Sequence, residues 1–302
     1  MKKNSKITLA VLAAGVVLSL AARIFVITAH TDMKTGFLYH GDELLCNVLY
    51  YGIIVIAAVT AIFTSKYDEK NSAFGECTAK SITGAKAAVI GFLTLGTGLF
   101  AAYEGYTEIH AITRNMFLVI VDFLFGAALI AIAFATLYKK EFTPGLGYSF
   151  SFIGVYCVCR GIYCFMSRMA IVTVPEYLIE CLCLIVMAVF FLLLGRFLSG
   201  NETKHTRKAM CFWGVGTSAL TLSSAFGTII ASIAAPEAVR SRIVMTSYDA
   251  ESFRQASEGV DAYKMVYTPW VNVFLGLLTA AVLVIMFMNK SPKSDISETE
   301  SN

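Results

Sequence analysis

Charged residues lie inside, or at the ends of, stretches that are otherwise strongly apolar, and Glu104 at the end of one such stretch is an example. Five of these charged residues are candidate site residues: Arg23, Glu43, Asp122, Arg160 and Glu180. A charged side chain in hydrocarbon costs about 2.5–3.5 kcal/mol on insertion scales, so such groups usually face the interior of a helix bundle and pair there. Arginine also binds anionic groups through two parallel hydrogen bonds. These residues predict either a buried network of ion pairs or a binding site for a small anionic solute, in which Glu180 or Asp122 sets selectivity or carries a proton.

The arginine and glutamate positions recur along the chain. Arg23 precedes Glu43 by twenty residues, and Arg160 precedes Glu180 by the same number. A shift of 137 residues superimposes the two pairs. Because charges of this kind are scarce in an apolar chain, their recurrence predicts an internal repeat. Two halves with an even number of spans each would run parallel, related by an axis near the membrane normal.

Histidine and cysteine are the other residues that could hold a metal ion. His30, His40 and His110 fall near acidic residues in expected loops, but the chain shows no close-spaced ligand motif. Most of the eight cysteines fall in apolar segments, and pairs two residues apart, such as Cys157 and Cys159, lie on different faces of a helix. We therefore predict buried thiols, no metal site and no cofactor.

Sequence signatures of enzymes are missing as well. The chain contains no His-Glu-x-x-His, Gly-x-Gly-Asp or Gly-x-Ser-x-Gly pattern and no phosphate-binding loop of the Walker type. We therefore predict no catalytic residues and a protein that is not an enzyme.

The composition places these charges in a membrane protein. Of 302 residues, 57% are hydrophobic and only 15% are charged, against about 25% in ordinary globular proteins. The net charge of +3 is too small, and its basic residues are too dispersed, to indicate a nucleic acid partner. The lipid bilayer is the partner that the composition predicts.

Apolar runs of about 20 residues are long enough to cross the roughly 30 Å of hydrocarbon in a bilayer. Such runs, which favour helices over barrel strands, predict an all-α bundle of eight transmembrane helices. The predicted spans are 7–29, 44–64, 86–103, 116–137, 147–167, 177–199, 208–234 and 269–289.

The distribution of lysine and arginine predicts the orientation of these spans in the cell membrane. With the N-terminus inside, fifteen of the 24 basic residues fall on the cytoplasmic side and seven on the outer side. Both termini are therefore predicted to be cytoplasmic. In this orientation Arg23, Arg160, Glu180 and Asp122 lie in the outer half of the membrane.

Three segments follow from the repeat and the spans. Residues 1–140 form the first predicted four-helix half, residues 141–290 form the second, and residues 291–302 form a polar cytoplasmic tail that we expect to be disordered. Within the second half, residues 235–268 form either a short helix on the outer surface or a polar loop.

Small residues form a stripe with helical spacing in the third and the seventh predicted spans. Such stripes allow close helix packing in lipid, and a hydroxyl-rich stripe can also line a path for a solute. The stripes are Gly91, Thr94, Gly98 and Ala101 in the third span, and Gly214, Thr217, Thr221, Ser224 and Thr228 in the seventh.

One resemblance lies just after the first span. An arginine-bearing first helix precedes the pattern Asp32-x-x-Thr35-Gly36-Phe37, in which glycine supplies the unusual dihedral of a turn. Over residues 23–37 the chain resembles a family of uncharacterised multi-pass membrane proteins from Clostridia-type Gram-positive bacteria. The resemblance implies a host of that type and supplies no catalytic residues.

Two functions agree with these features. The first is a non-catalytic membrane component, such as a sensor, an assembly partner or an accessory subunit, that works with another membrane protein. The alternative is a transporter of a small anionic solute with an outward-facing site around Arg23 and Arg160. The transporter predicts a water-accessible cavity that holds both arginines, whereas the first function predicts charges that pair with one another in a closed core.

Overall fold

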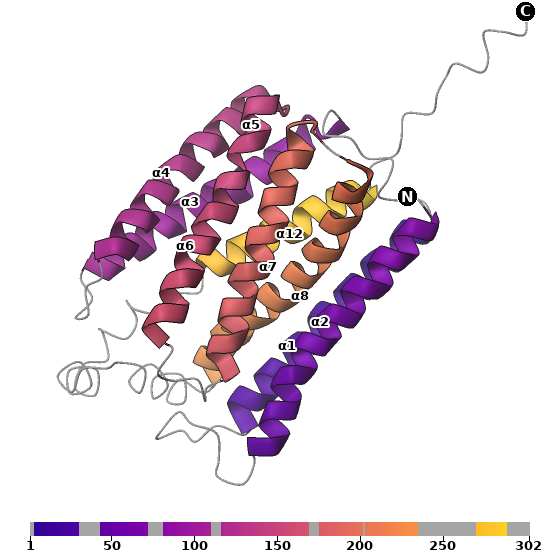
Figure 1. Cartoon of the computed structure of the whole chain (residues 1–302), viewed down its shortest axis with the longest axis vertical. Coiled ribbons are helices and arrows are strands. Elements are labelled where there is room, and N and C mark those ends of the chain that lie inside the picture. The colour runs from indigo at the N-terminus through magenta and orange to yellow at the C-terminus, as the bar shows by residue number, and fades with distance from the viewer. Residues whose placement is uncertain are drawn as a thin grey trace, which may run out of the picture.

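The computed structural model describes residues 3–29, 43–71, 81–109, 116–168, 175–201, 203–234 and 270–288. Within these ranges all regular secondary structure is helical, which confirms the all-α fold class (Figure 1). The helices are α1 (Lys3–Ala29), α2 (Glu43–Asn71), α3 (Ala85–Ile109), α4 (Met116–Lys139), α5 (Pro144–Ser149), α6 (Ser151–Arg168), α7 (Pro175–Leu198), α8 (Lys204–Ala234) and α12 (Trp270–Met288).

Six of these helices are long and apolar enough to cross a membrane, namely α1, α3, α4, α7, α8 and α12. This is the pattern of a multi-pass membrane protein. The remaining two predicted spans correspond to α2, in which a shorter apolar stretch covers Tyr51–Lys66 of the described residues, and to α6. Both helices carry charges, Lys66 and Asp68 in α2 and Arg160 in α6. A count of eight spans therefore stays a prediction that depends on α2 and α6.

The predicted fifth span is divided in two. Thr143 is extended, with φ −81° and ψ 156°, and Pro144 begins α5, as expected because proline suits the first turn of a helix. Phe150 then separates α5 from α6 and donates its backbone N–H to the carbonyl of Gly147 at 3.1 Å. The predicted start at residue 147 thus falls inside α5, and α6 begins at Ser151.

Helix α8 is the centre of the bundle, since it packs against α1, α2, α7 and α12. Helix α12 also packs against α3, and α3 packs closely along α4. In Figure 1 the α1–α2 hairpin, in indigo and purple, and the α3–α4 pair lie on opposite sides of α7, α8 and α12. The order of packing therefore differs from the order of the chain.

This packing joins helices of both predicted halves. The α1–α2 hairpin, from residues 1–140, packs on α8, and α3 packs on α12, so each hairpin of the first half has a partner in residues 141–290. The division at residue 140 and the internal repeat stay predictions. The tail at 291–302, the segment at 235–268 and the Thr35-Gly36-Phe37 turn lie outside the described residues.

The small-residue stripe of α3 lies against α4. A Cβ atom added at Gly98 would lie 3.0 Å from the carbonyl oxygen of Gly126, and one added at Gly126 would lie 2.9 Å from the backbone nitrogen of Ala102. Backbones approach this closely only where side chains are absent, as in other membrane helix pairs. The stripe of α3 is therefore a close-packing surface that holds α3 and α4 in register.

Candidate functional site

A cluster of four polar side chains joins three helices near the end where α3 ends and α4 begins. Glu104 comes from α3, Asp122 comes from α4, and Tyr156 and Arg160 come from α6. Tyr156 and Arg160 are four residues apart, so they lie on one face of α6. We call these four residues the Arg160 cluster.

The guanidinium group of Arg160 is the centre of this cluster. Its Nη1 atom lies 2.5 Å from Glu104 Oε2 and 3.4 Å from Asp122 Oδ1. The same nitrogen donates a hydrogen bond of 2.5 Å to the Tyr156 hydroxyl, and that hydroxyl donates one of 2.8 Å to Asp122 Oδ1. Tyr156 thus accepts from the arginine and donates to the aspartate, which connects the charges of α6 and α4.

Both acids of the cluster are buried within the protein. Asp122 is 2% exposed and Glu104 is 8% exposed, whereas the side chain of Arg160 keeps 23% of its surface. The ring of Tyr156 stacks on Phe125 with centroids 3.6 Å apart. Gly105 leaves room for Asp122, whose Cβ atom would lie 3.2 Å from a side chain placed at Gly105. The packing of α3 on α4 therefore brings the two acids together.

A fourth helix also reaches the cluster. The carboxyl group of Glu104 accepts a hydrogen bond from the backbone N–H of Val271, in the first turn of α12. The first N–H groups of a helix have no partner within the helix, and they carry a partial positive charge of about half an elementary charge. Glu104 therefore connects α3 to both Arg160 and the amino end of α12.

Among the described side chains, the structure brings the predicted site residues Arg160 and Asp122 together. Arg23 lies elsewhere, buried at 5% exposure in α1, where it packs against Gly227 of α8. Glu180 lies in α7, and its charge and that of Arg23 both act on the thiol of Cys183. Helix α1 packs on α2, α8 and α12, whereas α6 packs on α7, α4 and α5. The two arginines therefore belong to different parts of the bundle.

Glu43 begins α2, but its side chain lies outside the described part of the structure. Two members of the cluster, Glu104 and Tyr156, are not among the predicted site residues. Glu104 shows a sequence signal, because it is an acid at the end of an apolar run. Tyr156 shows a weaker signal, because it lies one helical turn before Arg160 and its hydroxyl needs a partner when it is buried.

Helix α8 carries the second small-residue stripe. Thr217 and Thr221 are buried, as is the neighbouring Ser218. The hydroxyl oxygens of Thr217 and Ser218 have no hydrogen-bond partner among the described residues, whereas the side chain of Thr221 lies beside the thiol of Cys183 in α7. Gly214 of the same stripe packs against Phe190 of α7 and Leu283 of α12. The stripe therefore serves close packing at Gly214.

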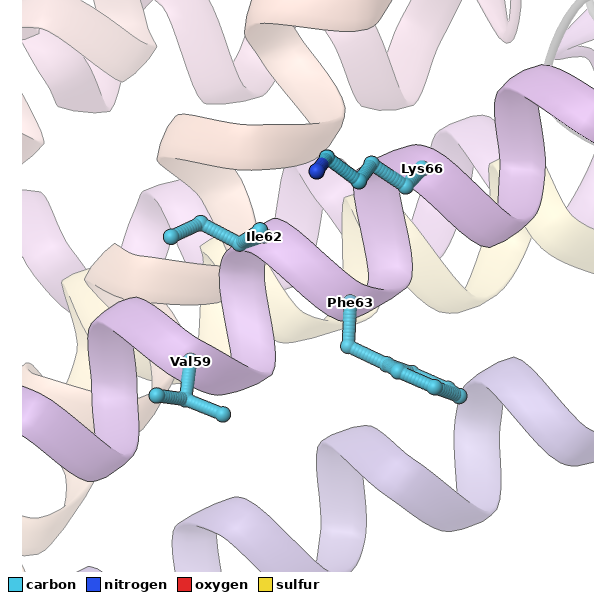
Figure 2. Close-up of a pocket in the computed structure, with 4 residues that line it drawn as sticks. All are labelled: Val59, Ile62, Phe63 and Lys66. Carbon is cyan, nitrogen blue, oxygen red and sulfur yellow. The ribbon is translucent and has the colours of Figure 1, made fainter.

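Metal-binding and surface features add no second site. The described residues contain no group of three or more His, Cys, Asp or Glu side chains that could hold a metal ion, and His30, His40 and His110 lie outside them. A shallow depression on α2 is lined by Val59, Ile62, Phe63 and Lys66 (Figure 2). It is mainly apolar and contains no member of the Arg160 cluster.

The chain matches no known protein family, no curated protein and no solved structure. The chemistry of the Arg160 cluster and the packing around it therefore carry the functional argument.

Proposed function

We propose that this protein is a non-catalytic component of the cell membrane, such as a sensor, an assembly partner or an accessory subunit, in which the Arg160 cluster locks α6 to the α3–α4 pair. The observation that carries the proposal is the position of Arg160 Nη1, in contact with the carboxyl groups of both Glu104 and Asp122. The guanidinium group of Arg160 is therefore already paired with carboxyl groups of the protein.

The packing of the helices around the cluster indicates which contact the cluster stabilises. Helix α6 packs closely against α7 but only sparsely against α4. In lipid no hydrophobic force drives helices together, so small residues and polar contacts decide which helices associate. Glycines let α3 and α4 pack closely. The α4–α6 contact instead contains the polar contacts of Tyr156, Asp122 and Arg160 and the stacking of Tyr156 on Phe125. Loss of the cluster would therefore separate α6 from α4 before it separates α3 from α4.

The alternative is a transporter that binds a small anionic solute around Arg23 and Arg160. The burial of Arg23 against α8 favours a functional role for that residue. At Arg160, however, an anion would have to displace two carboxyl groups, and the Arg160 cluster has an excess of acids over bases. The two arginines also lie on helices that are not packed closely together. These observations favour the non-catalytic component.

The sequence favours a membrane orientation and a host for this component. The lysine and arginine distribution favours cytoplasmic termini, and the resemblance over residues 23–37 favours a Gram-positive bacterial host. A component without its own reaction needs a partner, so we propose a second membrane protein in contact with the lipid-facing helices.

The two functions differ in a flux experiment. The purified protein is reconstituted in liposomes, and uptake of chloride, phosphate and small carboxylates is compared with that of protein-free liposomes and of an Arg23→Gln variant. The proposed function predicts no uptake above that of protein-free liposomes. Saturable uptake by the wild type that is lost in Arg23→Gln and in Arg160→Gln would establish the transporter instead.

A further inference from the structure

The Arg160 cluster contains two carboxyl groups and one guanidinium group, so it carries one negative charge when all three are ionised. The buried position of both acids makes that charge costly, because a membrane interior offers little water to solvate it. The amino end of α12 at Val271 offsets only part of it, since a helix end is equivalent to about half a charge. The ionised cluster therefore favours the binding of one additional positive charge.

The geometry places both acids on one base. Arg160 Nη1 lies 2.5 Å from Glu104 Oε2 and 3.4 Å from Asp122 Oδ1, so two buried carboxyl groups share one guanidinium nitrogen. Two carboxyl groups that share one site usually hold a proton between them, because both cannot be ionised without repulsion. A proton is also the cation that needs the least space in this closely packed region.

We propose that the Arg160 cluster is a proton-binding site, in which Glu104 and Asp122 share one exchangeable proton whose uptake loosens α6 from α3 and α4. The inference rests on the lock proposed above. In the binding step a hydronium ion transfers its proton to a carboxylate oxygen and leaves as water. The resulting carboxyl group is neutral, so it attracts Arg160 less and the lock weakens.

The groups around the cluster are consistent with a single proton. Asp122 interacts with Arg160 and Tyr156, and Glu104 interacts with Arg160, Asp122 and the backbone of Val271. Other titratable side chains in the described parts of the helices around the cluster include Cys157 and Cys159 of α6, Tyr103 and Tyr106 of α3, Tyr163 of α6, and Glu180, Cys181 and Cys183 of α7.

The cluster is also positioned for exchange with one aqueous phase. Glu104 lies five residues before the end of α3 at Ile109, and Asp122 lies six residues after the start of α4 at Met116. At about 1.5 Å per residue, both are within roughly 10 Å of their helix ends. The side chain of Arg160 is 23% exposed. By the predicted orientation, this end of the bundle faces outside.

A native tryptophan can report on the site. Trp270 opens α12 next to Val271, and its ring stacks on Phe100 of α3 with centroids 5.6 Å apart. Trp213 is the only other tryptophan, so a Trp213→Phe background leaves Trp270 alone. In nanodiscs, its emission is recorded between about pH 4 and pH 8, the range in which carboxyl groups of this kind titrate. We expect one reversible transition that fits one proton.

Two substitutions and one matched control test the assignment. Asp122→Asn and Glu104→Gln each remove the excess acid, so each should abolish the transition and reduce the proton uptake measured by potentiometric titration by one proton per protein. Glu180→Gln removes a carboxyl group from the same membrane region but from α7, so the transition should remain. Circular dichroism and gel filtration establish which variants are folded.

A measurement on the wild type covers the case in which the variants do not fold. The infrared difference spectrum between low and high pH should show the band of a protonated buried carboxyl group. A wild type with neither this band nor a Trp270 transition, or a transition that persists in both Asp122→Asn and Glu104→Gln, would overturn the proton site. A different result would contradict only the proposed function. If substitution of Arg160 leaves the contact between α4 and α6 unchanged while one proton still binds, the cluster does not hold α6 to α4.

Discussion

The hydroxyl of Tyr156 donates a hydrogen bond of 2.8 Å to Asp122 Oδ1 and accepts one of 2.5 Å from Arg160 Nη1. One neutral side chain thus lies between an acid of α4 and a base of its own helix. The aspartate and the arginine are also paired directly, with Arg160 Nη1 3.4 Å from Asp122 Oδ1. Tyr156 therefore decides how strongly the two charges interact, and its hydroxyl can be removed without changing either charge.

Tyr156→Phe should destabilise the protein by about 1–3 kcal/mol, because it removes the nearer of the two donors to a buried carboxylate while the ring keeps its stacking on Phe125. The measurement is thermal unfolding in detergent, followed by circular dichroism. Tyr138→Phe is the matched control, since Tyr138 is 90% exposed on α4 and should tolerate the change. Equal melting temperatures for the two variants would contradict the role of the hydroxyl.

Arg160→Gln should be more damaging than Tyr156→Phe, because it leaves Glu104 and Asp122 as two buried acids without their base. Removal of one partner from a buried ion pair typically costs about 3–5 kcal/mol. The triple variant that also carries Glu104→Gln and Asp122→Asn should recover much of this loss, since no uncompensated charge remains. Unfolding in mixed micelles measures both.

Arg196→Gln is the control for the arginine change, because Arg196 lies exposed in the last turn of α7. It should unfold as the wild type does. If the triple variant is as unstable as Arg160→Gln alone, the damage comes from lost packing of the arginine stem and not from unpaired acids.

The helices of this protein could be predicted from sequence much better than the partners of its charges. A run of apolar residues as long as Met116–Lys139 has few structures available to it in lipid other than a helix. The same run is apolar on all sides, so its pattern does not say which face meets a neighbour. The rotation of α4 that turns Asp122 inward follows from Gly126, which packs on α3. That contact is visible only in three dimensions.

The regular spacing of Arg160 and Glu180 directs attention to a partner on the next helix. The partners of Arg160 are instead Asp122 and Glu104, which come earlier in the chain, on α4 and α3. The choice depends on which helices are neighbours: α6 packs against α4 as well as against α7, and α3 packs along α4. The expectation that intramembrane charges pair rests on solvation alone, which is why it needs no knowledge of topology.

Gly126→Ala should destabilise the α3–α4 contact by about 1–3 kcal/mol, because the added methyl group would lie 2.9 Å from backbone atoms of Ala102 and Gly98. Backbone atoms of two packed helices cannot move aside as a flexible side chain can. Gly52→Ala provides the comparison, since a Cβ atom at Gly52 in α2 meets no atom within 4 Å. That variant should be neutral, or more stable by up to about 1 kcal/mol through helix propensity. The idea fails if Gly126→Ala also stabilises the protein.

The ends of several helices meet at the opposite end of the bundle from the Arg160 cluster. The backbone N–H of Gly84, before α3, donates a hydrogen bond of 3.0 Å to the carbonyl of Lys140, after α4. The side chain of Asn201, after α7, donates to the hydroxyl of Tyr148 in α5. These contacts place the start of α3, the end of α4, the short helix α5 and the end of α7 at one end of the molecule.

We predict from this arrangement that α6 crosses the membrane even though Arg160 lowers its apolar character. Helix α7 is apolar enough to span, and α6 packs along it. The 18 residues of α6 reach about 27 Å, close to the roughly 30 Å of a hydrocarbon core.

Labelling of cysteines tests this prediction. In a variant without native cysteines, single cysteines placed at Glu141 and Asn201 should both react with a membrane-impermeant maleimide only after the cells are permeabilised. Lys6→Cys, in α1 near the N-terminus, should also be labelled only after the cells are permeabilised. Labelling of Glu141→Cys and Asn201→Cys from opposite sides would show that α6 and α7 do not both cross.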